Sequence, residues 1–140
     1  MSTWHPAYRE GVLANDYRFA AENLLHHFVD AMTAHLDTVL RMPAYADADT
    51  QAQGAELRRA LVALHDAPAP EQAPDVPDLY FALQRRLEER LGDAVGLIRV
   101  GLSRNDLDMT VYKMNGRAYH LEVGRRLLRL RELLPERAER

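Results

Sequence analysis

Apolar residues recur at helical spacing along most of the chain, which predicts an all-helical (all-α) fold. In residues 16–42 they form one stripe with a period near 3.6 residues. We predict a single helix there, capped by Asn15 or Asp16 and stopped by Pro43. The first fifteen residues carry no such stripe, and we expect them to form an irregular arm. Four apolar side chains could attach this arm to a neighbouring surface: Trp4, Tyr8, Val12 and Leu13.

A second helix and a proline-rich loop are expected next. The helix covers about residues 50–65 and is capped by Asp47 or Asp49. Because glycine is a poor helix former, Gly54 should weaken its first half. Three prolines then fall within residues 67–75 and force an extended loop, since proline removes a backbone donor and fixes φ.

Leucines at every fourth position mark the third helix. It starts near Pro77, a favourable first-turn residue, and Gly92 lies where a left-handed C-cap would end it. The leucines are Leu79, Leu83, Leu87 and Leu91. Residues 94–102 are apolar but contain two glycines and have no second strand to pair with, so we predict a loop there.

The last helical pattern is the longest. Asn105 or Asp106 can cap it, and nothing interrupts it before Pro135, which gives about 28 residues or ~42 Å. Its first apolar rail is Leu107, Val111, Met114, Ala118 and Leu121, and its second is Val123, Leu127, Leu130 and Leu134. Spacings of three and four are typical of helical bundles. Because a small domain cannot cover such a helix, we expect partner helices on another chain and an oligomer formed through residues 107–134.

Composition and charge exclude several classes of function. The 140 residues carry a net charge of −3 and no cysteine, so neither nucleic acid nor a membrane is an expected partner and no thiolate chemistry is possible. Only His27 and His35 could share a helix face, and their spacing is too long for one metal ion, so we expect no metal or other cofactor. With no signal peptide and no apolar run long enough to cross a bilayer, the expected location is cytoplasmic.

A dense polar block, Ser103, Arg104 and Asn105, lies at the start of the last helix. A helix N-terminus offers unpaired N–H groups and a positive dipole end, and a guanidinium matches a carboxylate in shape. The block therefore predicts a carboxylate-binding site. The alternative is that Asn105 or Asp106 only caps the helix while Arg104 is solvated.

The sequence on both sides of this block follows a known pattern. The run GLIRVGLSRND (residues 96–106), Gly92 and the run PDLYFALQRRL (residues 77–87) match consecutive segments of one family. Upstream, Asp30, Thr33, Ala34 and His35 look like its Asp…Ser…Ala-His segment. The chain thus resembles the N-terminal portion of the argininosuccinate lyase family, in the fumarase/aspartase superfamily. The resemblance implies a small N-terminal helical domain at residues 1–102. At residues 103–140 it implies the substrate-binding motif and the first long helix of a central helical bundle.

The resemblance also implies a chemistry. Lyases of this family eliminate fumarate from an N-substituted aspartate, and their Ser-Arg-Asn segment holds the substrate carboxylate. It assigns substrate binding to Ser103, Arg104 and Asn105, adds Thr33 as a further contact, and places no catalytic acid or base on this chain. We therefore expect one component of a split lyase that acts by β-elimination on an aspartate- or succinate-type substrate. The family segments that follow position 140 would come from a second chain.

Departures from the family pattern leave other possibilities open. Arg99 and Val100 replace a His-Thr pair, and Leu102 replaces an arginine. In the family these positions recognise the non-fumarate half of argininosuccinate, so a different substrate is expected here. A second possibility is a non-catalytic scaffold module that associates with a lyase homologue. A third is that the chain is the front part of a longer product.

Overall fold

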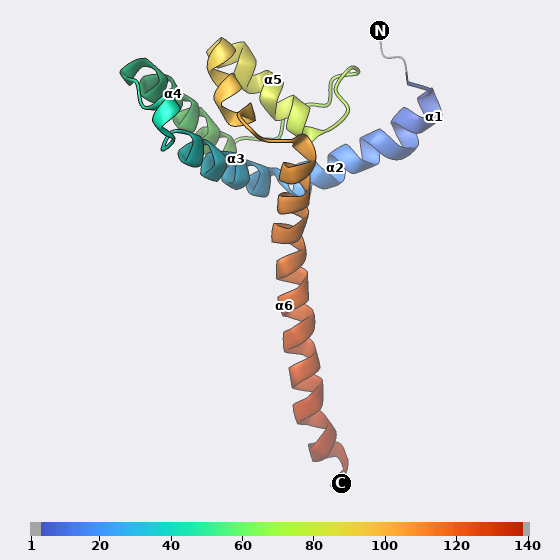
Figure 1. Cartoon of the computed structure of the whole chain (residues 1–140). Coiled ribbons are helices and arrows are strands. Elements are labelled where there is room, and N and C mark those ends of the chain that lie inside the picture. Colours follow the sequence, from blue (N-terminus) through green and yellow to red (C-terminus); the bar gives the residue numbers. More distant parts are fainter. Residues whose placement is uncertain (1–3, 139–140) are drawn as a thin grey trace.

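The computed structural model describes residues 4–138, and every regular element among them is helical. The all-α prediction is therefore confirmed, while the lyase-type central bundle stays a prediction. Figure 1 shows a head of packed helices from which α6 (Arg104–Ala138) projects as a long stalk. A shorter arm, made of α1 (Pro6–Tyr8), η1 (Arg9–Leu13) and α2 (Ala14–Asn23), leaves the head on another side.

The arm is helical, so the prediction of an irregular arm is wrong. The α-turn of α1 passes into a five-residue π-helix, η1, and then into α2 without a gap. The ring of His5 caps this start, because its Nδ1 accepts the N–H of Ala7 at 3.2 Å. Of the apolar residues expected to attach the arm, Leu13 is buried, whereas Tyr8 and Val12 are exposed. A local cap, and not an apolar stripe, was the signal for this helix.

The single helix predicted over residues 16–42 is divided in two. Leu24, with φ −117° and ψ −10°, interrupts the chain between α2 and α3 (Leu25–Val39). The bend directs α2 away from the head while Leu24 itself stays buried. The buried face of α3 forms the centre of the core and consists of Phe28, Val29, Met32, Leu36 and Val39. Pro43 opens a short 3-10 turn, η2 (Pro43–Tyr45), beyond the end of α3.

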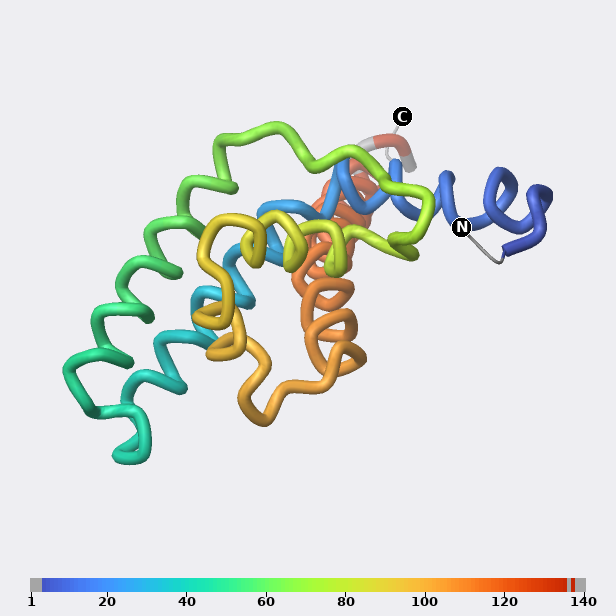
Figure 2. The backbone as a smooth tube through the Cα atoms, turned by 90° about the horizontal axis from the view of Figure 1, so that it is seen from above, coloured from blue at the N-terminus to red at the C-terminus, as the bar shows by residue number. Residues whose placement is uncertain are grey.

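The second predicted helix, α4 (Ala48–His65), is confirmed and lies beside α3 in Figure 2. Asp47 caps it, with Oδ1 accepting the N–H of Thr50 at 2.9 Å. Gly54 has a role that its low helix propensity did not suggest. It is buried against Leu40, and a Cβ at this position would overlap both methyl groups of that leucine. Glycine therefore permits the close approach of α4 to the end of α3.

Residues 66–78 form the predicted extended loop, after which α5 (Leu79–Leu91) begins. Asp78 caps α5, because its Oδ1 accepts the N–H of Phe81 at 3.1 Å. Gly92 ends α5 as predicted and has a positive φ of 56°, which favours glycine, but its ψ of −133° differs from the predicted left-handed cap. The prediction of a loop over residues 94–102 is wrong for residues 94–99, because these residues belong to a 3-10 helix, η3 (Gly92–Arg99). Three side chains explain why this segment packs on the core: Val95, Leu97 and Ile98 are buried.

The last helix is longer than predicted. α6 has 35 residues, which correspond to about 52 Å, and Pro135 lies inside it and does not end it. Leu107 and Val111, in its first two turns, are buried in the core that α3 centres. Every large apolar side chain from Tyr119 to Leu134 is exposed. The head therefore covers only the beginning of this helix (Figure 1).

Candidate functional site

Ser103 and Asp106 cap the N-terminus of α6 reciprocally. Ser103 Oγ accepts the N–H of Asn105 at 3.3 Å, and Asp106 Oδ2 accepts the N–H of Ser103 at 3.3 Å. This is a capping box, in which two donors of the helix start are satisfied by side chains. The predicted caps, Asn105 or Asp106, are corrected: Ser103 is the N-cap and Asp106 is its partner. The Ser103 hydroxyl, one of the predicted substrate contacts, thus has a structural use.

Arg104 connects the N-termini of α5 and α6. Its Nη2 lies 2.8 Å from Asp78 Oδ2, and its Nε lies 3.3 Å from Asp108 Oδ2. The contact to Asp78 lacks hydrogen-bond alignment, so it is an ion pair between charges in contact. The guanidinium also lies over the ring of Phe81, at 5.6 Å from its centroid. Arg104 is therefore exposed to solvent on one side and contacts two carboxylates and an aromatic ring on the other.

The charge around Arg104 does not favour a third carboxylate. Burial raises the pKa of Asp108, Arg104 lowers it, and Asp78 raises it again. One guanidinium thus faces two acidic groups, and an anionic ligand would have to displace one of them. The side chain of Asn105 has no partner among residues 4–138 and is exposed, so it is the member of the block that remains free to bind.

Thr33 belongs to a different part of the surface. It lines a groove of about 530 Å³ between α3 and α4, which the polar block does not line. Its Oγ1 is buried and has no hydrogen-bond partner among the described residues. Polar groups of the groove are paired with each other, Asp37 with Arg58 at 3.0 Å and Asp30 with His65 at 3.4 Å. The structure therefore does not join Thr33 to Ser103, Arg104 and Asn105 in one site.

A histidine cluster at one end of α3 and α4 was missed by the sequence analysis. The rings of His26 and His27 have centroids 4.1 Å apart, and His65 from α4 lies 6.3 Å from His26. Burial lowers the pKa of His27, His26 lowers it further, and Asp30 opposes this. Within residues 4–138, no group of three acidic or histidine residues has a metal-binding arrangement. Only the antiparallel pairing of the two helices could have revealed this cluster.

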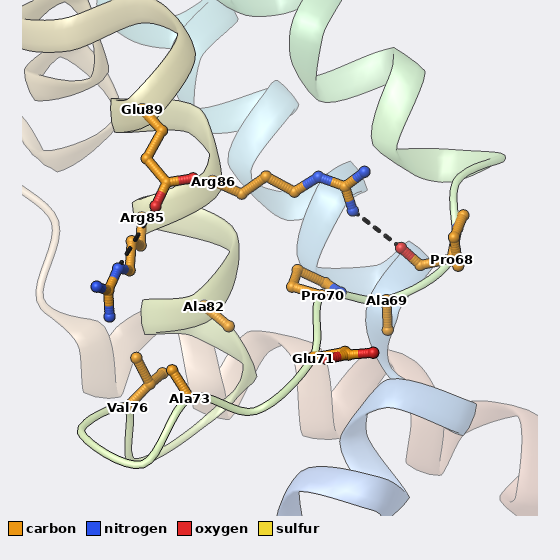
Figure 3. A pocket seen from close by; sticks show the side chains of 10 residues that line it. All are labelled: Pro68, Ala69, Pro70, Glu71, Ala73, Val76, Ala82, Arg85, Arg86 and Glu89. Carbon is orange, nitrogen blue, oxygen red and sulfur yellow. Dashed lines mark hydrogen bonds and ion pairs between the residues drawn. The ribbon is translucent and has the colours of Figure 1, made fainter.

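The proline-rich loop covers a groove of about 450 Å³ beside α5, shown in Figure 3. Arg86 Nη1 donates to the carbonyl oxygen of Pro68 at 3.0 Å, and the Tyr17 hydroxyl donates to that of Pro70 at 2.6 Å. Arg85 pairs with Asp75 at 3.1 Å. The basic groups near this groove thus hold the loop in place, and none of them is left for a ligand.

The outer face of α6 carries a row of exposed large apolar side chains. We define it as seven side chains that recur at intervals of three, four or seven residues: Met109, Tyr112, Tyr119, Val123, Leu127, Leu130 and Leu134. Their exposed fractions lie between 52% and 60%. At about 100° per residue, this stripe lies roughly opposite Leu107 and Val111, which face the head. The outer face thus contains the four residues of the predicted second rail and adds Met109, Tyr112 and Tyr119, which lie nearer to the head.

These features can be set against known proteins. No helix within residues 4–138 combines the length and the hydropathy that crossing a bilayer requires. No protein-family model, curated protein sequence or solved structure matches this chain.

Proposed function

We propose that this chain is an interaction subunit that presents the outer face of α6 to the helices of a lyase homologue. The observation that carries the proposal is the exposure of this face. Seven large apolar side chains extend over about 38 Å of helix without cover from the head. Burial of side chains that are half exposed contributes on the order of 1 kcal/mol each, which is enough to drive helix association. The lyase-type bundle that the sequence resembles is an arrangement that would cover this face.

The polar block has a matching role in this proposal. Ser103 and Asp106 fix the first turn of α6, and Arg104 ties that turn to the start of α5. The block thus sets the direction in which α6 leaves the head. A helix must be held in a defined orientation to enter a bundle, because packing angles fall into a few classes.

The test uses the lyase homologue itself. The full chain is mixed with the full-length argininosuccinate lyase homologue of the same organism, and complex formation is followed by size-exclusion chromatography with light scattering. We expect a complex with the natural sequence and none with the double variant Val123→Glu and Leu127→Glu. Ala118→Glu is the matched control, since Ala118 is exposed on the opposite side of α6. Equal binding by all three proteins contradicts a role for the outer face, and no binding by the natural sequence contradicts this choice of partner.

A second candidate is the carboxylate-binding component of a split lyase that eliminates fumarate from an aspartate- or succinate-type substrate. It is favoured by the exposure of Ser103, Arg104 and Asn105 at a helix N-terminus, where a partner subunit could complete a site. The test is Arg104→Ala in the complex with the partner chain. Elimination activity that survives this change in an intact complex rules out the candidate.

A further inference from the structure

One side of the outer face is basic along its length. Lys113, Arg117, His120 and Arg131 project from the same side of α6, at intervals that are close to whole helical turns, and all four are exposed. We name these four residues the basic flank. None of the three permanent cations has an acidic partner among the side chains that the structure describes. On the other side of the outer face, Arg126 is already paired with Glu122 at 2.8 Å. The basic flank therefore lines one side of the apolar stripe without an acidic side chain among the described residues, whereas on the other side Glu122 offsets part of the charge of Arg125 and Arg126.

Charge is also divided between the two ends of the molecule. Residues 109–138 contain seven basic and three acidic side chains, a net charge of +4. Residues 1–108 contain ten basic and seventeen acidic side chains, a net charge of −7. The stalk is thus a cationic helix on an anionic head, although the whole chain is near neutral.

We propose that the outer face binds an amphipathic helix whose apolar seam is bordered by glutamate or aspartate on the side that meets the basic flank. This inference rests on the proposed function, since it specifies the chemistry of the partner that covers α6. Apolar contacts along the stripe supply affinity, and the acidic border selects the partner and its direction.

Charge argues against a second copy of this chain as the partner. In an antiparallel pair related by a two-fold axis, each flank faces the same flank of the other helix. In a pair centred on residue 122, for example, Lys113 would oppose Arg131 of the other copy. In a parallel pair the two heads, each with a net charge of −7, would lie side by side. Both arrangements place like charges together.

An anionic membrane fits less well for the same reason. A helix with an apolar stripe and a basic border can lie on a lipid surface. Here the head that carries the stripe is anionic, and Glu122 lies beside the stripe. A helical partner can avoid the head and contact only the stalk, whereas a flat surface cannot.

The experiment uses two synthetic helical peptides of equal length with the same leucine seam. One has glutamate at all flanking positions and the other has lysine. Binding of the full chain to each peptide is measured by fluorescence anisotropy at low and high salt. We expect the glutamate peptide to bind at least about tenfold more tightly, since several surface ion pairs replace repulsions. The difference should shrink at about 0.5 M salt, where the Debye length falls to a few ångströms.

Charge reversal on the chain provides the second arm. Arg117→Glu with Arg131→Glu should invert the preference, so that the lysine peptide binds more tightly. Both positions are exposed and far from the core, and circular dichroism checks that the head stays folded. The double variant Val123→Glu and Leu127→Glu should bind both peptides more weakly than the natural sequence does.

The remaining outcomes overturn the inference in different ways. Equal binding of the two peptides removes the charge selection and leaves the interaction role of α6 intact. Binding of neither peptide removes both the inference and the interaction role. Dimerisation of the chain alone in sedimentation experiments, abolished by Val123→Glu with Leu127→Glu, assigns the face to a second copy. Binding to vesicles of phosphatidylcholine and phosphatidylserine with the same sensitivity assigns it to a membrane.

Discussion

The two ends of α6 are the same helix in two environments. In its first turns Leu107 and Val111 are 2% and 0% exposed, and further along Leu127 and Leu134 are each 60% exposed. The residue types are alike, so composition does not distinguish them. Local interactions such as the capping box and the pair of Glu122 with Arg126 are therefore sufficient to favour a helix in both regions. Whether its apolar side chains are buried depends instead on contact with the head.

Truncation of one leucine in each region should give the largest contrast. Leu36→Ala leaves a cavity beside side chains that are fully buried, and we expect the free energy of unfolding to fall by about 2–5 kcal/mol. Leu127→Ala removes an exposed side chain, and we expect a change within about 0.5 kcal/mol. Urea unfolding of the isolated chain, followed by circular dichroism, measures both. A loss above about 1 kcal/mol for Leu127→Ala would show that the stalk is already covered in solution.

Removal of Arg104 should affect the junction between head and stalk by an intermediate amount. Its side chain is 45% exposed, so the loss of its ion pairs should lower the free energy of unfolding by no more than about 1 kcal/mol. Burial already raises the pKa of Asp108 above 3.8, and Arg104→Ala should raise it further because Arg104 lowers it. The pKa is measured by carbon NMR of the Asp108 carboxyl group.

The sign of the pH dependence follows from that shift. A carboxyl group with a raised pKa in the folded state favours folding below its unfolded pKa, and this contribution is lost as the pH rises through the folded value. Arg104→Ala should therefore be more destabilising at pH 7 than at pH 3. Arg85→Ala is the control, because Arg85 pairs with Asp75 and not with Asp108. An unchanged Asp108 pKa in Arg104→Ala would contradict the arrangement of this cluster.

His27 should make the head sensitive to mild acid. Burial lowers its pKa below 6.5, so protonation favours the unfolded chain. The contribution of His27 to stability is complete above pH 6.5 and is lost as the pH falls through that value towards the folded pKa. His27→Gln should therefore reduce the loss of unfolding free energy between pH 7.5 and pH 5.5. An unchanged loss in His27→Gln would contradict the burial of this ring.

Replacing one glycine in the stalk and one in the head by alanine should change the free energy of unfolding by small amounts that differ between the two positions. Gly116, within α6, has no atom near the position of an added Cβ, so Gly116→Ala should raise helicity and stability by up to about 1 kcal/mol. At Gly54 the same gain in helix propensity is opposed by overlap with Leu40, and we expect Gly54→Ala to be neutral or destabilising. Circular dichroism and urea unfolding compare the two variants. A stabilising Gly54→Ala would contradict the close approach of α3 and α4.

The parts of the fold that local chemistry determines were predictable from the sequence. Asp47 begins a helix and Gly92 ends one as predicted, because a cap depends on a few neighbouring residues. Asp78, and not a first turn at Pro77, begins α5. The break at Leu24 and the helix through Pro135 were not predicted. The apolar stripe continues through the first of these, and only the surrounding structure decides whether a stripe bends.

The candidate site was predictable in position but not in its contacts. The sequence located the polar block at the start of the last helix, which is where it lies. Asp78 is far from Arg104 in the sequence, and nothing in the local pattern indicated that it would reach this guanidinium. The surroundings of Thr33 and the histidine cluster could not be predicted for the same reason, since both depend on how α3 pairs with α4. Contacts between distant segments set the chemistry of each of these groups.

α6 is attached to the head only over its first two turns, so a small change of angle there moves its far end by a large distance. Arg104 and the capping box hold one end, and the far end lies about 50 Å away. A tilt of α6 by about 10° about its N-terminal attachment displaces its C-terminal end by about 9 Å, roughly the distance between the axes of packed helices. A change as small as the loss of one carboxylate beside Arg104 could thus decide whether the tip of α6 meets its partner in register.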